Sequence, residues 1–225
     1  MSFKDQIFIV IPAYNESKVV ASVIDELNEN GYSNVIVVDD GSSDSTYKAL
    51  LGRNVTVLRH MLNRGKGAAV KTGIEAAKRM GAQIVITFDA DGQHDPKDIA
   101  GMIELLHKGS DVVLGKRDFS SKKIPYFKRL GNRLGNMLTW MVYGLWVQDS
   151  QSGLRAYSNR ALDLIQTSTD RYEYDSEVIR EIARNNLKWI EYPMHVRYTK
   201  YSQEKLNKQS AMGGLKTAIR MILSN

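Results

Sequence analysis

The stretch Ile84-Val-Ile-Thr-Phe-Asp-Ala-Asp-Gly-Gln-His94 decides the fold, because it joins an apolar run to a group of polar side chains. Residues 84–88 are mostly β-branched or aromatic, which is typical of a strand buried on both faces. Asp89 and Asp91 follow at once. Ligands of open parallel sheets bind just beyond the carboxyl ends of the strands, so these two carboxylates mark a candidate site.

Apolar runs typical of strands alternate with helical patterns throughout the first 115 residues. Apolar runs predict further strands at residues 7–11, 35–38, 55–58 and 111–114. Helical spacing of apolar residues predicts helices over residues 18–28, 45–51, 67–80 and 96–108. The first strand is expected to end at Pro12. This pattern indicates an α/β fold, with a mostly parallel sheet and helices on both of its faces.

The second half of the chain is less regular. We expect helices over residues 129–143, 161–164 and 176–185, a strand over 189–192 and a basic loop over 122–128. Glu173, Asp175 and Glu177 are expected to precede and cap the helix that follows them. Residues 1–210 are predicted to form one domain. Residues 211–225 are predicted to form a short amphipathic helix that contacts a membrane or a partner.

Composition narrows the class of protein. The chain of 225 residues has no cysteine and a net charge of +6. A disulfide, a thiolate metal site and a Cys nucleophile are therefore excluded, and the basic excess favours partners that carry phosphate. The apolar stretch at residues 137–147 is shorter than the ~20 residues that cross a bilayer. We expect a cytoplasmic protein that can rest on a membrane without spanning it.

Three strand ends should meet at one edge of the sheet, namely residues 12–16, 39–44 and 89–94. A nucleotide fits such an edge. Asp40 can accept a hydrogen bond from a base N–H, Tyr14 can stack on the base, and Glu16 can reach the base or the ribose. The alternative is that strand-end residues only cap helices and form turns, which is the simpler interpretation of Asp44.

Asp89, Asp91 and Gln93 form the predicted metal site. Their oxygens are the hard ligands that Mg²⁺ or Mn²⁺ prefers, and a diphosphate would supply the remaining oxygens. Such a metal neutralises charge on a departing nucleotide diphosphate. An EF-hand is excluded, because no acidic residue stands at loop position 12. The alternative is an Asx-turn leading into the helix at Pro96, and the sequence leaves the role of His94 open.

Five motifs stand in order along the chain. They are Ile11-Pro-Ala-Tyr-Asn-Glu16, Asp39-Asp-Gly-Ser-Ser-Asp44, Asn63-Arg-Gly-Lys-Gly67, Asp89-Ala-Asp-Gly-Gln-His94 and Gln151-Ser-Gly-Leu-Arg155. Together they resemble the family 2 glycosyltransferases, specifically the dolichyl-phosphate mannosyltransferase-like branch, over roughly residues 7–208. The resemblance implies a GT-A fold and an inverting reaction. A sugar would move from a nucleotide diphosphate to a polyprenyl phosphate at the cytoplasmic face of the membrane.

The resemblance also implies roles for individual residues. Asp91, Arg117 and Lys205 are the predicted catalytic residues, with Arg117 near the two phosphates and Lys205 closing over the donor diphosphate. Asp91 and Gln93, beside Asp89, are the implied metal ligands. The predicted substrate-binding residues are Pro12, Ala13, Tyr14, Glu16, Val38, Asp39, Asp40, Lys66, Asp89, Ala90, Arg117, Arg133, Asp149, Arg197 and Lys205.

The chain departs from this branch near its end. Where relatives have Gly-Glu-Ser-Lys, the sequence reads Tyr201-Ser-Gln-Glu-Lys205, and their late arginine falls on Thr199. Arg197 or Lys200 would have to replace that arginine. The donor therefore stays open among the GDP-mannose, UDP-glucose and UDP-GlcNAc types. Many relatives also carry transmembrane helices; here the C-terminal helix or a small membrane-protein partner would provide the anchor.

The acceptor decides whether a general base is needed. A phosphate acceptor is already an anion, so transfer would depend on alignment and on cations at the leaving diphosphate, with Arg117, Arg133 and Lys205 as candidates. A sugar-hydroxyl acceptor, the first alternative, would need a carboxylate base, for which Asp149 is the candidate. A nucleotidyltransferase of the same fold is a further form of this alternative. Such an enzyme would usually carry a Gly-rich loop with basic residues after the first strand, where this chain has Pro12-Ala-Tyr-Asn-Glu16.

A non-catalytic scaffold or nucleic-acid-binding protein is the second alternative, from a different functional class. The charge permits it, but aromatic and basic residues do not interleave on the predicted strands. A scaffold would also have little use for the residues of the predicted metal site. We therefore expect no nucleic-acid partner.

Overall fold

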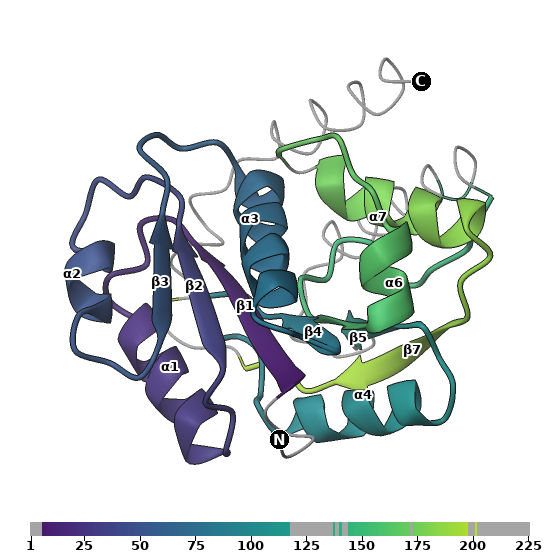
Figure 1. Cartoon of the computed structure of the whole chain (residues 1–225), viewed down its shortest axis with the longest axis horizontal. Helices are drawn as coiled ribbons and strands as arrows, with labels where there is room; N and C mark the ends of the chain where they lie inside the picture. Colours follow the sequence, from purple (N-terminus) through teal and green to yellow (C-terminus); the bar gives the residue numbers. More distant parts are fainter. Residues whose placement is uncertain are drawn as a thin grey trace.

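Seven strands form one sheet within the part of the chain that the structure, a computed structural model, describes. The structure describes residues 6–117, 137, 140, 144–171, 173–197 and 201. The strand order is β3-β2-β1-β4-β6-β5-β7 (Figure 1). Four parallel strands make up one half of the sheet: β1 (Ile7–Ala13), β2 (Val35–Asp39), β3 (Thr56–Arg59) and β4 (Ile84–Thr87). Their carboxyl ends share one edge, as the sequence predicts.

The other half of the sheet is mixed. β6 (Arg155–Ser158) runs antiparallel between β4 and β5 (Val112–Arg117). β7 (Trp189–Met194) pairs with β5 in parallel at the outer edge. The insertion of β6 brings the segment just before it, which includes Gly153, against the end of β4.

Helices cover both faces of the sheet, as predicted. α1 (Val20–Glu29), α2 (Thr46–Leu50) and α4 (Asp98–His107) pack on one face. α3 (Lys66–Arg79), α6 (Asn159–Leu164) and α7 (Glu173–Arg184) pack on the other. Ile9 and Val10 of β1 point to opposite faces and both are fully buried. Burial on both sides explains why this strand is a continuous apolar run.

Gly73 sets the close approach of α3 to the sheet. A β-carbon at this position would collide with the side chain of Val10 and would come within 3.3 Å of Val38 Cγ2. A glycine therefore lets the helix axis lie tight against β1 and β2. This contact fixes where the first turn of α3 stands at the carboxyl edge of the sheet.

Two local predictions are wrong, and one strand was not predicted. β1 continues through Pro12 to Ala13, because its pairing with β4 ends at Val10 and proline is tolerated on a strand side without a partner. β6 was not predicted, since it has four residues and starts on a charged one, Arg155. The acidic residues at 173–177 lie inside α7 and do not precede it.

Several predicted segments lie outside the described residues. They are the basic loop at 122–128, most of the helix at 129–143, and the amphipathic helix at 211–225 together with the domain boundary before it. The predictions for these segments stay predictions.

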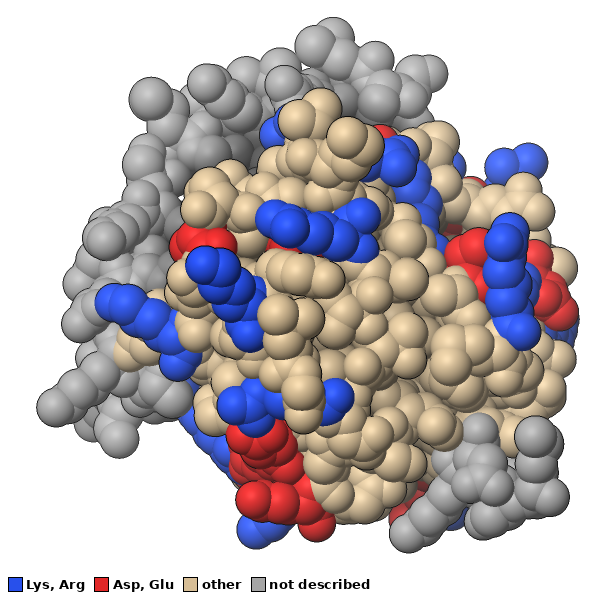
Figure 2. Space-filling model, turned by 60° about the vertical axis from the view of Figure 1, so that its left-hand side comes forward, with Lys and Arg blue, Asp and Glu red and all other residues tan. Residues whose placement is uncertain are grey.

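The surface shown in Figure 2 carries dispersed charge. Lys and Arg side chains form separate groups there, with groups of Asp and Glu among them. The described Lys and Arg side chains on this face are not gathered into one basic patch. Among the described helices, none is both long and apolar enough to cross a bilayer.

Glu177 ties α7 to the segment before it. Its carboxylate accepts hydrogen bonds from the backbone N–H groups of Ser168 (3.0 Å) and Thr169 (2.8 Å) and from both hydroxyls. Burial alone would raise the pKa of Glu177, but these hydrogen bonds outweigh that effect and lower the pKa to about 2. The folded state therefore holds this group ionised at a pH where the unfolded chain would protonate it.

Glu177→Gln should lower the free energy of unfolding by about 2–3 kcal/mol at neutral pH. The contribution of the charged carboxylate is complete above its unfolded pKa of ~4.3 and is lost as the pH falls from there to the folded value. The difference between the two proteins in denaturant titrations should therefore shrink below pH ~4.3. Glu75→Gln, an exposed control, should change stability little. A wild-type-to-variant difference that stays constant from pH 7 to pH 3 would contradict this account.

Candidate active site

A cleft of about 480 Å³ opens at the carboxyl ends of β1, β2 and β4. We call it the main cleft. Nine residues predicted from the sequence line it: Pro12, Ala13, Tyr14, Glu16, Asp40, Lys66, Asp89, Ala90 and Asp91. Its volume lies in the range of small-molecule binding sites. The structure thus brings the first four sequence motifs together in one place.

Asn15 joins the loop after β1 to the loop after β2. It adopts a φ of 56°, which asparagine tolerates better than most residues. Its side-chain oxygen accepts from the backbone N–H of Ser43 at 2.9 Å, and its own N–H donates to Ser42 Oγ at 2.9 Å. Next to it, Glu16 accepts a hydrogen bond from the Tyr201 hydroxyl at 2.7 Å. One wall of the main cleft is therefore cross-linked by hydrogen bonds before any ligand binds.

Asp40 holds the opposite wall. Its carboxylate accepts from the backbone N–H groups of Arg64 (3.0 Å) and Gly65 (2.7 Å), and His60 Nδ1 lies 2.7 Å from it. Gly65 has a φ of 108°, and a β-carbon there would press on the backbone of Asp170. The glycine of this motif is therefore needed for backbone shape. A carboxylate has about four acceptor positions, so Asp40 can still accept from a ligand.

A chain of alternating charges runs beneath the main cleft. Lys66 Nζ lies 3.1 Å from Asp89 Oδ1 and 3.7 Å from Asp175 Oδ2. Asp175 in turn lies 3.2 Å from the guanidinium of Arg155, which is only 2% exposed. These four residues join the end of β4, the start of α3, the first turn of α7 and the start of β6. The inner pair, Asp175 and Arg155, is buried, whereas the side chains of Lys66 and Asp89 are 25% and 28% exposed. We call the four residues the buried ion chain after this inner pair.

The pKa values of Lys66, Asp89 and Arg155 each shift in the direction that keeps the side chain charged. Burial alone would lower the pKa of Lys66, but the charges of Asp175 and Asp89 raise it well above its ordinary value. Burial would raise the pKa of Asp89, but Lys66 and His94 hold it well below its ordinary range. For Arg155, Asp175 likewise outweighs burial. Opposite charges at short range thus offset the cost of removing these groups from water.

Gly153 and His94 fix the orientation of Asp89. A β-carbon on Gly153 would collide with both carboxylate oxygens of Asp89, so a larger residue there would displace this carboxylate. His94 Nε2 lies 3.1 Å from Asp89 Oδ2, and its ring packs edge-on against Phe88 with centroids 5.2 Å apart. His94, whose role the sequence leaves open, therefore supports the first carboxylate of the predicted metal site.

Asp91 and Gln93 lie together at the end of the same loop. Gln93 donates to Asp91 through its backbone N–H at 3.0 Å and its side-chain amide at 2.9 Å. The described residues contain no group of three or more acidic or histidine side chains that could hold a metal alone. Asp89 is neutralised by Lys66. A cation here would therefore take one or two protein oxygens and would need phosphate oxygens for the rest, which suits Mg²⁺.

A smaller cleft of about 150 Å³ adjoins the main cleft and shares Asp89 and Asp91 with it. Arg117, at the end of β5, lines this smaller cleft. Its guanidinium binds Asp149 through two parallel contacts, Nε to Oδ2 at 2.6 Å and an amino nitrogen to Oδ1 at 2.7 Å. The side chain of Asp149 is fully buried. Asp149 therefore positions Arg117, and both of its oxygens are engaged.

Some predicted residues do not line either cleft. Val38 lies in the core under α3, and Asp39 is buried beside Ser42 and Arg59. Arg197 pairs with Glu26 at 2.6 Å and with Asp95 at 2.8 Å. Arg133 and Lys205 lie outside the described residues, so their predicted roles stay predictions.

Several residues that the structure places at the site were not assigned a role from the sequence, and four of them are charged or titratable. They are His60, Arg155, Arg171 and Asp175. Arg155 ends the fifth motif, which was a usable signal, and Asp175 was interpreted as a helix cap. Arg171 lines the main cleft without any local motif. Contacts between residues so far apart in the sequence are not visible without the fold.

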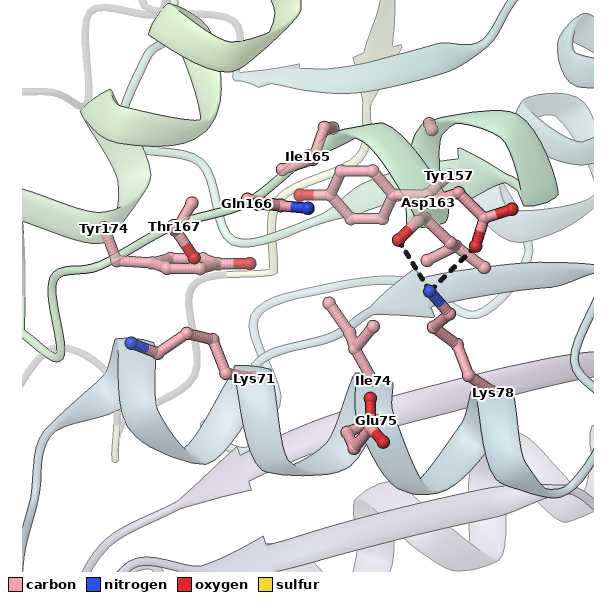
Figure 3. Close-up of a pocket in the computed structure, with 12 residues that line it drawn as sticks. Lys71, Ile74, Glu75, Lys78, Tyr157, Asp163, Ile165, Gln166, Thr167 and Tyr174 are labelled. Atoms are coloured by element: carbon pink, nitrogen blue, oxygen red, sulfur yellow. Dashed lines mark hydrogen bonds and ion pairs between the residues drawn. The ribbon is translucent and has the colours of Figure 1, made fainter.

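A separate cavity of about 300 Å³ lies between α3, α6 and the segment that joins α6 to α7 (Figure 3). It shares no lining residue with the main cleft. Its two lysines are already paired, Lys78 with Asp163 at 2.8 Å and Lys71 with Asp170 at 2.7 Å. The predicted phosphate chemistry therefore belongs to the main cleft.

Residues 8–165 match the family model described as glycosyl transferase family 2. The chain belongs to that family. This confirms the resemblance seen in the five motifs and makes the protein a glycosyltransferase. The main cleft, where four of those motifs meet, is accordingly the candidate active site of a family 2 glycosyltransferase.

Named relatives agree with this assignment. The chain is 36% identical to the UDP-N-acetylglucosamine–dolichyl-phosphate N-acetylglucosaminyltransferase of Methanococcus voltae, over 96% of this chain and 95% of that protein. It is 24% identical to the polyprenol monophosphomannose synthase of Mycolicibacterium smegmatis, over 83% of this chain and 75% of that protein. Both lie in the polyprenyl-phosphate branch that the sequence resembles.

A solved structure supports the fold of this family 2 glycosyltransferase. Glucosyl-3-phosphoglycerate synthase from Mycobacterium tuberculosis, solved with Mn²⁺, UDP and glucosyl-3-phosphoglycerate, superposes with a TM-score of 0.68. The match has 19% sequence identity and covers 95% of this chain and 80% of that chain. The predicted GT-A fold is thereby confirmed.

Asp175→Asn should destabilise the protein by about 3–5 kcal/mol, because it leaves Lys66 and Arg155 short of a buried counter-charge. Asn keeps the size of the side chain, so the change tests the charge. Asp163→Asn removes a carboxylate that is 58% exposed from its pair with Lys78 and should cost less than about 1 kcal/mol. Urea titration of both variants measures the difference. Equal losses in the two variants would show that the buried ion chain has no special weight.

Proposed function

We propose that this glycosyltransferase moves a sugar from a UDP-sugar, with UDP-N-acetylglucosamine as the first candidate, to a dolichyl or polyprenyl phosphate. The donor follows from the Methanococcus relative, which is more similar and more fully matched than the mannose-transferring one. UDP in the structural neighbour is in keeping with this choice. GDP-mannose and UDP-glucose are the competing donors.

The ion pair between Arg117 and Asp149 is the main support for a phosphate acceptor. A hydroxyl acceptor needs a carboxylate base, and Asp149 was the candidate. Both oxygens of Asp149 are bound to Arg117 at 2.6 and 2.7 Å. An acceptor that is already an anion has no need of such a base, and Arg117 offers it a cation. The arrangement therefore favours a phosphate acceptor over a sugar hydroxyl.

Asp91 and Gln93 would hold a divalent ion together with the donor diphosphate, and Asp89 would lie beside it. The structural neighbours with Mn²⁺ or Mg²⁺ support this assignment. Such an ion neutralises the charge that develops on the leaving diphosphate. The amide nitrogen of Gln93 donates to Asp91, so its carbonyl oxygen keeps its acceptor capacity for a cation.

The reaction then needs alignment more than proton transfer. An oxygen of the acceptor phosphate forms a bond to the anomeric carbon while the bond from that carbon to the donor diphosphate breaks, and the configuration inverts. UDP leaves with the electron pair, so no proton has to move. Tyr14, Glu16 and Asp40 would hold the nucleoside, and Arg117 would hold the incoming phosphate at the junction of the two clefts.

The lipid acceptor implies contact with a membrane. We propose that the protein binds peripherally at the cytoplasmic face, through residues 211–225, the basic residues near 122–133 or a small membrane-protein partner. Arg133 and Lys205 would add cations around the phosphates. These segments lie outside the described residues, so their roles rest on the sequence alone.

Donor binding tests the proposal through thermal stability. UDP-N-acetylglucosamine should raise the unfolding temperature in Mn²⁺, less so in EDTA, and more than GDP-mannose does at equal concentration. A ligand at 100 times its Kd stabilises a protein by about 2.7 kcal/mol. Asp91→Asn should lose the metal-dependent part of the shift, while the surface control Asp163→Asn should keep it.

Two results would count against this function. A larger shift with GDP-mannose would overturn the donor assignment. No shift with any nucleotide sugar, from protein that unfolds cooperatively, would overturn the assignment of the main cleft as a donor site.

A further inference from the structure

Cations at the two clefts differ in how they are paired. Lys66 is held by Asp89 and Asp175, and Arg117 is held by Asp149. Arg171, which also lines the main cleft and is exposed, has no ion pair with any described carboxylate. It is therefore the cation of the main cleft whose charge the described structure leaves uncompensated.

The backbone of Arg171 is fixed against the start of α3. Its carbonyl accepts from the N–H of Tyr174 at 3.2 Å, and the carbonyl of its neighbour Asp170 accepts from the N–H of Ala68 at 3.0 Å. The side-chain stem lies against Gly65, where a β-carbon would come within 2.8 Å of Arg171 Cγ. The base of the side chain is thus anchored on both sides, while the guanidinium stays accessible from the cleft.

The neighbouring carboxylate does not neutralise Arg171. Asp170 pairs instead with Lys71 at 2.7 Å and with Arg64 at 3.7 Å. Asp170 is therefore shared between two other cations, although it is adjacent to Arg171 in the sequence. An exposed guanidinium that lines the cleft and has no ion-pair partner among the described residues is suited to bind an anionic ligand there.

We propose that Arg171 binds the diphosphate of the nucleotide-sugar donor. This inference rests on the proposed function, because it takes the main cleft as the donor site. A planar guanidinium binds phosphate through two parallel hydrogen bonds, and the first turn of α3 adds its own preference for anions at the same place. The charge on the diphosphate grows as the sugar departs, so this contact strengthens during the reaction.

Arg171→Gln tests the contact through the nucleotide fragments that it affects. In isothermal titration with Mg²⁺ present, UDP should bind about tenfold or more weakly to the variant, because the variant loses a charged hydrogen bond to phosphate. UMP should be affected less, and uridine, which has no phosphate, should bind the two proteins equally. Arg171→Lys should recover part of the UDP affinity. Arg79→Gln, which removes one charge from an exposed face of α3, is the matched control and should leave all three affinities unchanged.

Each other outcome contradicts a defined part of the argument. Equal UDP affinity in wild type and Arg171→Gln would overturn the role of Arg171 and leave the donor site standing. Equal losses for UDP and uridine would show that Arg171 contacts the base or supports the fold. Failure of the wild-type protein to bind UDP or GDP at all would overturn the proposed function together with this inference.

Discussion

The buried ion chain of Asp89, Lys66, Asp175 and Arg155 is the interaction on which the rest of the site depends. Each carboxylate lies between two cations or beside one, at 3.1–3.7 Å. Removing Asp175 would leave Arg155 charged and buried without its ion-pair partner, which costs far more than an intact pair contributes. The four residues come from the loop after β4 and from α3, α7 and β6. These ion pairs therefore connect both halves of the chain beneath the main cleft.

The carboxylates of the site differ in their roles. Carboxylates that have protein partners, such as Asp40 and Asp149, position loops and a cation. Asp91 lines both clefts, and in the proposed function it would meet a metal and the donor diphosphate there. Preorganised charges of this kind need little rearrangement when a leaving group becomes negative. The same logic makes a phosphate acceptor suitable, because it brings its own charge and needs no base.

The sequence predicted the parallel half of the sheet well, because strands such as residues 35–38 are buried on both faces and read as unbroken apolar runs. It also predicted most of the main cleft, since Asp40, Asp89 and Asp91 follow such strands directly. It missed β6, whose four residues start on Arg155, and the partners of Lys66, because these contacts join residues distant in the chain. Arg197 has the right charge for the site but pairs with Glu26 instead. The charge of a residue in the sequence does not predict which residue it pairs with in the folded protein.

Transfer of label from UDP-N-acetylglucosamine to dolichyl phosphate is the measurement that tests the central claim most directly. Purified protein in detergent with Mg²⁺ would be given the labelled donor and the lipid, and the organic phase would be analysed for a glycosyl phosphate. The account predicts a lipid-soluble product and an equal amount of UDP, both lost in Asp91→Asn. Label that stays in water, or that moves to a sugar hydroxyl and not to the lipid phosphate, would contradict it.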